Sequence, residues 1–288
     1  MKAICLRTEY LKEPLGLGNT TPHFFWNCEG GTAQSAYRIV ACRDGETVWD
    51  SGKVRSSEMT HIAYGGAPLQ SRDKIRWQVT LWDENDEEGE PTESRFELGL
   101  LSSEDWTAKW ITGDTKPQKK YRMSVDCFRK KLVFFRKVTC ARLYASACGV
   151  YDVHVNGKRI ESFILAPGMT DYRKRIQYQT YDVTELLDKQ TTLEIRLADG
   201  WYRGSSAAYG VTHVYGDTLS VIAQLEVTYE DGTSAVFGTD DTWEWCNDGP
   251  IRFADLKDGE VYDARMAPTY GGKAKIIEIG RASCRERV

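Results

Sequence analysis

The chain has 288 residues, of which 41% are hydrophobic, and a formal net charge of −4 at pH 7. This length predicts about two domains with buried cores, and the composition excludes an intrinsically disordered chain. The small net charge, without a long basic run, argues against nucleic acid as a partner.

Three further features of the composition indicate the fold class and the cellular compartment. Nine Trp and fifteen Tyr, with few helical apolar repeats, predict packed β-sheets. No apolar run is long enough for a signal peptide or a membrane span, which predicts a cytoplasmic protein without a membrane partner. The eight cysteines are scattered without a CxxC pair, as is typical of reduced core thiols.

Residues 1–99 are predicted to form a fibronectin-like or immunoglobulin-like β-sandwich, because short strands alternate with turn signals. The clearest strand is 75–83, and its alternation places Ile75, Trp77, Val79 and Leu81 on the inner face. Asp44-Gly45 predicts a hairpin turn. The other predicted strands are 24–26, 36–41, 47–49 and 94–98.

The acidic run DENDEEGE at 83–90 allows two interpretations. It could hold calcium, but it lacks the regular oxygen spacing of a calcium loop. A solvated hairpin tip is the interpretation that the pattern favours.

Residues 100–127 are predicted to be a linker. Ser102 or Ser103 is placed to cap a short helical turn over 104–105. Trp106 and Trp110 are then expected to anchor the linker between the domains.

Residues 128–267 are predicted to form a jelly-roll sandwich of eight or more antiparallel strands. Asn156-Gly157 and Asp231-Gly232 predict hairpins, and a helical turn capped by Thr184 is expected at 183–188. The predicted strands include 132–138, 141–148, 150–155, 176–183, 193–197, 219–229, 234–238 and 242–245. Residues 250–263 are expected to form a last strand and an acidic turn.

Two loops of this second domain combine flat aromatic rings with charged groups that form hydrogen bonds. That combination suits a sugar, which has an apolar face and a rim of hydroxyls. The alternative is that the aromatic rings are core or loop-anchoring residues. The candidate residues are Asp171, Tyr172, Arg173, Asp199, Trp201, Tyr202 and Arg203.

Residues 268–288 are predicted to be a tail outside the second domain. Its last part, 278–288 (EIGRASCRERV), has no alternation and resembles the translated read-through of a sequencing adapter. We therefore expect 278–288 not to be native; a short native basic tail is the alternative.

No motif of a known catalytic centre is present: there is no GxSxG, P-loop, GxGxxG or HExxH. The four histidines have no metal-ligand spacing, and His154 alternates with apolar residues as a structural histidine does. Four acidic residues at 255–263 lie in a turn-rich segment where charges are usually solvated. No catalytic residue and no metal ligand is therefore assigned.

Long motifs in both predicted domains resemble bacterial α-L-rhamnosidases of glycoside hydrolase family 78. In the first domain these are SAYRIVA, VWDSGKV, RWQVTLWDENDE, FELGLL and DWTAKWI. In the second they are GVYDVHVNGKRI, LAPGMTDYRKRIQYQTYDVT, LADGWYRG, YGDTLSVIAQLEVTYEDG and DLKDGEVYDAR. The resemblance runs in order from about residue 6 to 267.

The resemblance implies that these are the N-terminal domains of an inverting enzyme that removes terminal α-L-rhamnose. The family's two catalytic glutamates lie on an (α/α)6 barrel that follows these domains, so none is carried over to this chain. The expected partners are that barrel and rhamnose-containing glycans. The fragment alone is expected to be inactive.

Three roles for these domains are kept as alternatives: docking onto the barrel, binding sugar, and serving as a purely structural spacer. The aromatic loops could dock onto the missing barrel, which the notable Arg and Tyr content favours slightly. The chain could instead be a stand-alone rhamnose-binding module, since its jelly roll is similar in type to carbohydrate-binding modules. Some of those bind rhamnose with calcium, so calcium is the one cofactor that the resemblance suggests.

Overall fold

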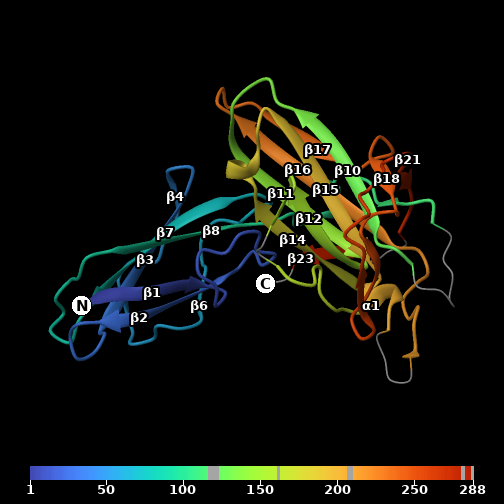
Figure 1. Cartoon of the computed structure of the whole chain (residues 1–288). Coiled ribbons are helices and arrows are strands. Elements are labelled where there is room, and N and C mark those ends of the chain that lie inside the picture. The colour runs from blue at the N-terminus through green and yellow to red at the C-terminus, as the bar shows by residue number, and fades with distance from the viewer. Residues whose placement is uncertain (116–122, 161–162, 206–209, 280–282, 287–288) are drawn as a thin grey trace. The chain divides into compact units, whose positions relative to one another are not determined.

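The computed structural model describes residues 1–115, 123–160, 163–205, 210–279 and 283–286. The chain divides into unit 1, Met1–Asp105, and unit 2, Trp106–Arg285 (Figure 1). Both units are built from β-strands, as predicted. In the described ranges, no helix combines the length and the apolar character needed to cross a membrane.

Unit 1 contains two antiparallel sheets whose side chains share one core. The four residues predicted to face inward on the strand Lys74–Trp82 are buried, with 0–1% of their surface exposed. The first sheet has the order β1 (Lys2–Thr8), β2 (His23–Glu29), β6 (Ile62–Ala63). The second has the order β4 (Glu46–Asp50), β3 (Ala36–Arg43), β7 (Lys74–Trp82), β8 (Thr92–Glu97), and β5 (Val54–Arg55) pairs with β3.

Most of the turns and strands predicted for unit 1 are present in the structure. The β3–β4 hairpin turns at Asp44-Gly45, where both residues have positive φ. Strand β1 was not predicted, because a register shift between Ile4 and Arg7, with positive φ at Cys5, breaks its alternation. The predicted helical turn is η1 (Ser103–Asp105), and Ser102 Oγ accepts the N–H of Glu104 at 3.2 Å.

The acidic run at 83–90 is a hydrogen-bonded turn. Asp83 Oδ1 accepts the backbone N–H groups of Asn85 and Glu87. Asp86 pairs with Lys53 and Arg55. These carboxylates therefore stabilise the hairpin tip and its neighbours.

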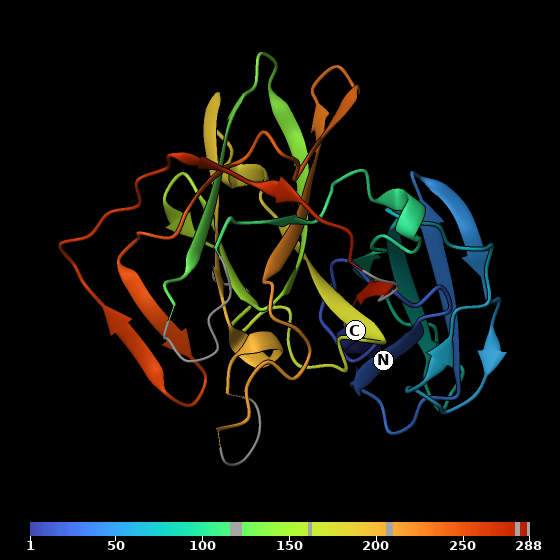
Figure 2. The same ribbon diagram turned by 90° about the vertical axis from the view of Figure 1, so that its right-hand side faces the viewer.

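Unit 2 contains two large antiparallel sheets around a second core, and a separate hairpin. One sheet has the order β13 (Lys158–Arg159), β12 (Val150–Val155), β15 (Gln190–Ala198), β10 (Asp126–Val133), β18 (Glu244–Cys246), β21 (Gly272–Lys273). The other has the order β22 (Lys275–Ile276), β9 (Ile111–Thr112), β16 (Ser220–Tyr229), β11 (Val138–Cys148), β14 (Arg175–Asp182), β23 (Ser283–Glu286), and β17 (Ser234–Gly238) pairs with β16. The separate hairpin is β19 (Ile251–Asp255) with β20 (Gly259–Tyr262), which stands away from the sheets in Figure 2.

The structure differs from the predicted elements of unit 2 in three places. Residues 132–138 are not one strand, because β10 ends at Val133 and the chain reverses before β11; the exposed Phe135 extended the apolar pattern across this turn. The helical turn η2 (Thr184–Leu186) has Val183, not Thr184, as its N-cap, without a side-chain cap. Residues 250–263 form the β19–β20 hairpin rather than a single strand with a turn.

The segments expected to be linker and tail also contribute strands. Residue Ile111 in β9 pairs with Val221 in β16, and Trp106 packs edge-on against Tyr178 at 5.5 Å between ring centroids. Strands β21 and β22 lie within 268–288 and pair with β18 and β9. Strand β23 lies within the segment expected not to be native. Unit 2 is thus longer at both ends than 128–267.

Tyr151 connects the two sheets at the centre of unit 2. It extends from β12, and its hydroxyl lies 2.8 Å from the carbonyl oxygen of Ala145 and 2.7 Å from Oε1 of Gln179. Gln179 Nε2 in turn donates to the carbonyl oxygen of Pro167 at 3.0 Å. The network fixes the segment around Pro167 to the core.

Replacing Tyr151 with Phe is expected to lower the free energy of unfolding by about 1–3 kcal/mol, since it leaves a buried acceptor unpaired. Urea unfolding of the two proteins would measure the difference. Tyr262→Phe is the matched control, because that side chain is 60% exposed and its change should have no measurable effect. Equal stability of the Tyr151 variant and the parent would contradict the assigned network.

Candidate functional site

The strand directions give unit 2 two ends. The hairpin end carries the turns 133–138, 155–158, 182–190 and 229–234. The loop end carries the connections 148–150, 163–175, 198–205 and 210–220. All seven candidate residues lie at the loop end.

The short helix α1 (Gly200–Arg203) carries most of the second candidate group. It follows β15 directly, and Asp199-Gly200 makes the turn between them. Gly200 has φ +52°, and a Cβ there would lie 2.3 Å from Cγ2 of Val150. Only glycine therefore fits between strand and helix at this position.

Arg203 and Asp199 form a buried ion pair on this helix. The guanidinium donates to Asp199 Oδ1 from Nε at 2.8 Å and from Nη2 at 2.6 Å. The Arg203 side chain is only 4% exposed, and its Nη1 donates to the carbonyl oxygen of Asp217. The two charges thus pair with each other inside the protein.

Tyr172 and Tyr202 bring the two candidate groups together. Their rings meet edge-on with centroids 5.4 Å apart, and Tyr172 also lies 5.1 Å from the ring of Tyr215. Trp201 packs against the same small cluster. Burial raises the pKa of Tyr202 to about 12 and raises that of Tyr172 above its usual range. These rings are loop anchors with neutral hydroxyls.

Asp171 and Arg173 form an exposed, local ion pair. Arg173 Nε donates to Asp171 Oδ1 at 2.9 Å, which lowers the pKa of the carboxyl. Asp171 also begins the turn, since its carbonyl oxygen accepts the N–H groups of Lys174 and Arg175. Of the seven candidates, Arg173 is the one classed as exposed.

Sequence reasoning missed Asp126, which lies at the same end of unit 2. The first residue of β10, it is 4% exposed and accepts hydrogen bonds from Trp245 Nε1 at 3.0 Å and from Thr115. Burial raises its pKa to about 6, although these donors and the charge of Arg203 act in the opposite direction. An aspartate at the start of a strand gives no sequence signal for such burial.

Two segments at the loop end expose apolar side chains; we call 163–169 and 211–214 the apolar loops. Ile164 is 77% exposed and Met169 is 59% exposed. Two candidate residues anchor these loops by hydrogen bonds. The Tyr172 hydroxyl donates to the carbonyl oxygen of Gly168, and the carbonyl oxygen of Arg203 accepts the N–H of His213. The other exposed apolar residues are Phe163, Leu165, Val211 and Val214.

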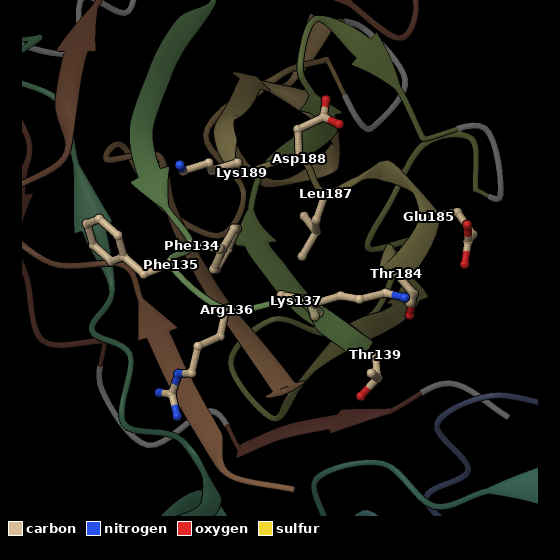
Figure 3. A pocket seen from close by; sticks show the side chains of 11 residues that line it. Phe134, Phe135, Arg136, Lys137, Thr139, Thr184, Glu185, Leu187, Asp188 and Lys189 are labelled. Carbon is tan, nitrogen blue, oxygen red and sulfur yellow. The ribbon is translucent and has the colours of Figure 1, made fainter. Parts of the chain in front are cut away.

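A cavity of about 680 Å³ opens at the other end, the hairpin end. Phe134 and Leu187 point into it, whereas Phe135 points away from it (Figure 3). Arg136 at its rim is held by Asp231 at 2.8 Å. None of the seven candidate residues lines this cavity. This cavity and the predicted site are thus separate features.

Metal ligation has no cluster to support it in the part of the chain that the structure describes. No group of three or more His, Cys, Asp or Glu side chains is found there within reach of one ion. The acidic residues at 255–263 stabilise turns instead: Asp255 accepts the N–H groups of Ser205, Lys257 and Asp258.

Comparison with known proteins adds the decisive observation. Residues 4–102 match the family described as Rha78A-like, N-terminal immunoglobulin domain. Residues 136–275 match the family described as alpha-L-rhamnosidase N-terminal domain. The chain therefore matches the N-terminal domains of α-L-rhamnosidases. The matches fall on units 1 and 2 respectively and support the predicted pair of β-sandwiches.

Individual rhamnosidases agree over almost the whole chain. An α-L-rhamnosidase of Formosa agariphila is 39% identical over 279 residues, covering 90% of this chain and 30% of that protein. One from an Alteromonas species is 38% identical, covering 87% of this chain and 29% of that protein. The chain therefore spans about 30% of the length of these relatives.

Solved rhamnosidase structures share the fold. The α-L-rhamnosidase of Dictyoglumus thermophilum is 29% identical with a TM-score of 0.89, covering 100% of this chain and 35% of that one. That of Aspergillus terreus is 28% identical with a TM-score of 0.89, covering 97% and 34%. In both, as in the curated relatives, this region is the smaller part of a longer rhamnosidase.

Proposed function

We propose that this chain serves an α-L-rhamnosidase that removes terminal α-L-rhamnose from glycosides, and that unit 2 docks on the remaining part of the enzyme. One observation carries the proposal: the apolar loops present exposed aliphatic side chains from a base of buried, paired residues. Apolar surface of this kind is typical of an interface. This chain covers 30% of the Formosa agariphila relative, so the other 70% or so of such an enzyme is the proposed docking partner.

Sugar binding by the seven candidate residues finds less support in the geometry. A sugar site needs open hydrogen-bonding groups beside an exposed ring. Here Arg203 and Asp199 satisfy each other, and Tyr172 is buried. The loop end is organised as a scaffold, with its apolar side chains outward.

Calorimetric titration of this chain with L-rhamnose, with calcium and then with a chelator, separates docking from sugar binding. We expect no saturable heat in either buffer, and no hydrolysis of a nitrophenyl rhamnoside by this chain alone. Saturable binding that Trp201→Ala abolishes in a folded protein would favour the rhamnose-binding alternative.

A chimera tests docking directly. This chain replaces the matching region of the Formosa agariphila rhamnosidase, and Ile164→Lys with Met169→Lys is introduced. We expect the melting temperature and the rhamnosidase activity of the chimera to fall, because a charge is forced into an apolar contact. The same changes should leave this chain alone as stable as before, since both side chains are exposed here.

Phe135→Lys is the matched control for the chimera. Phe135 is 88% exposed, more than either loop residue, but lies at the hairpin end. The control should leave the chimera unchanged. Docking at the loop end is refuted if both variants behave like the parent chimera, or if Phe135→Lys has the larger effect.

A further inference from the structure

Two buried cysteines face each other across neighbouring strands of unit 2. Cys127 in β10 is directly opposite Cys246 in β18, and the strands are antiparallel. Both are free thiols, 2% and 5% exposed. Residues paired in this way project from the same face of a sheet. The Cys127 thiol donates to the carbonyl oxygen of Val125 at 4.0 Å, and Cys246 acts directly on the pKa of Cys127.

The spacing of such a pair matches that of a disulfide. Directly opposite residues in an antiparallel ladder have Cα atoms about 4.5–5.5 Å apart. Disulfides bridge Cα atoms about 4.4–6.8 Å apart. A bond between the two sulfur atoms therefore needs little movement of the backbone.

We propose that Cys127 and Cys246 form a site of reversible oxidation, at which disulfide reagents of the glutathione type convert the thiol pair into a cross-strand disulfide. One thiolate attacks a sulfur of glutathione disulfide and releases one glutathione thiolate. The second thiolate then attacks the protein sulfur of the mixed disulfide and releases the other glutathione. The pair loses two electrons and two protons, and one glutathione disulfide becomes two glutathiones.

The surroundings of the two thiols slow their oxidation but still let the oxidant reach them. Contact with Cys246, and then burial, raise the pKa of the Cys127 thiol, so little thiolate is present at neutral pH. The charged groups nearby are Glu194 and Arg196 on β15, and Asp248, whose pKa is affected by Cys246. Access comes from local opening, because β18 and β21 at this sheet edge have only three and two residues.

The bond would change the mechanics of one segment. It would close a loop between residues 127 and 246 and fasten β18 to the centre of the sheet. The β19–β20 hairpin follows five residues later, so its base would be fixed as well. The site is distinct from the apolar loops and from the buried ion pair.

The test is incubation of the whole chain with oxidised glutathione at pH 8.5, followed by peptide mapping and thermal unfolding. We expect a peptide pair linked through Cys127 and Cys246, and a rise in melting temperature of about 5–10 °C that dithiothreitol reverses. Exposed Cys5 should acquire only a mixed disulfide with glutathione.

Three variants complete the test. Cys127→Ala and Cys246→Ala should each abolish the linked peptide and the rise in melting temperature. Cys148→Ala should retain both, since that thiol is equally buried but has Ser220 opposite it. Peptide mapping of the parent chain decides the matter even where a variant fails to fold. Disulfides between other cysteines, stable mixed disulfides at this pair, or unreacted thiols after prolonged incubation would each overturn the proposal.

Discussion

Replacing Arg203 with Ala is expected to lower the free energy of unfolding of unit 2 by about 3–5 kcal/mol. The change leaves the carboxylate of Asp199 largely buried, with 18% of its side chain exposed, and without its two charge-assisted hydrogen bonds. It also removes the donor to the carbonyl oxygen of Asp217. Urea unfolding, with hydrogen exchange to locate the effect in unit 2, would measure it.

Two controls separate burial from charge alone. Arg173→Ala removes a similar Asp–Arg pair at the surface, where 70% of the Arg173 side chain is accessible and solvent screens the charges, and should have a much smaller effect on stability. Asp199→Asn combined with Arg203→Met removes both charges and should recover part of the loss. If Arg203→Ala cost no more than Arg173→Ala, the loop end would not be the rigid base that docking requires.

Replacing Asp126 with Asn is expected to stabilise unit 2 by about 2–3 kcal/mol at pH 7.5. Burial raises the pKa of this carboxyl from 3.8 to about 6, so holding it ionised in the folded state costs free energy. Protonation of the Asp126 carboxyl stabilises the folded state in full below pH 4. This stabilisation is lost as the pH rises through 6. The Asn oxygen can still accept from Trp245 Nε1, which now donates at 3.0 Å.

The pH profile of the difference between variant and parent provides the check. The gain from Asp126→Asn should be full above pH 7 and should vanish near pH 4. Burial lowers the pKa of His154, which costs stability in acid, but this effect is common to both proteins and cancels. Asp171→Asn is the control of opposite sign, because Arg173 lowers the pKa of that exposed carboxyl. A gain that does not depend on pH would rule out ionisation of Asp126 as its cause.

Alternation and turn chemistry predicted most strands of both units. The inner face of β7 and the hairpins at Asp44-Gly45 and Asn156-Gly157 follow from period two and from residues that tolerate positive φ. The failures have equally local causes. A register shift hid β1, and the exposed Phe135 prolonged an apparent strand across a turn.

The sequence singled out two aromatic, charged loops but not the contacts between them. The structure brings the loops together where the rings of Tyr172 and Tyr202 meet. Spacing could not show that Arg203 would be buried against Asp199, because burial depends on what packs over the helix. The burial of Asp126 and the pairing of Cys127 with Cys246 could not be predicted for a similar reason. The order of the strands in the sheet, which spacing along the sequence does not show, brings β10 beside β15 and β18.

The pairing of β9 with β22 has a mechanical consequence. Ile111 lies opposite Ile276, and the N–H of Ile277 donates to the carbonyl oxygen of Trp110 at 2.9 Å. The chain thus enters and leaves this paired ladder at adjacent points. Tension applied between Trp110 and Ile277 would separate these two short strands one hydrogen bond at a time. The long β11–β16 pair lies further inside the sheet and would carry this load only after β9 and β22 had separated.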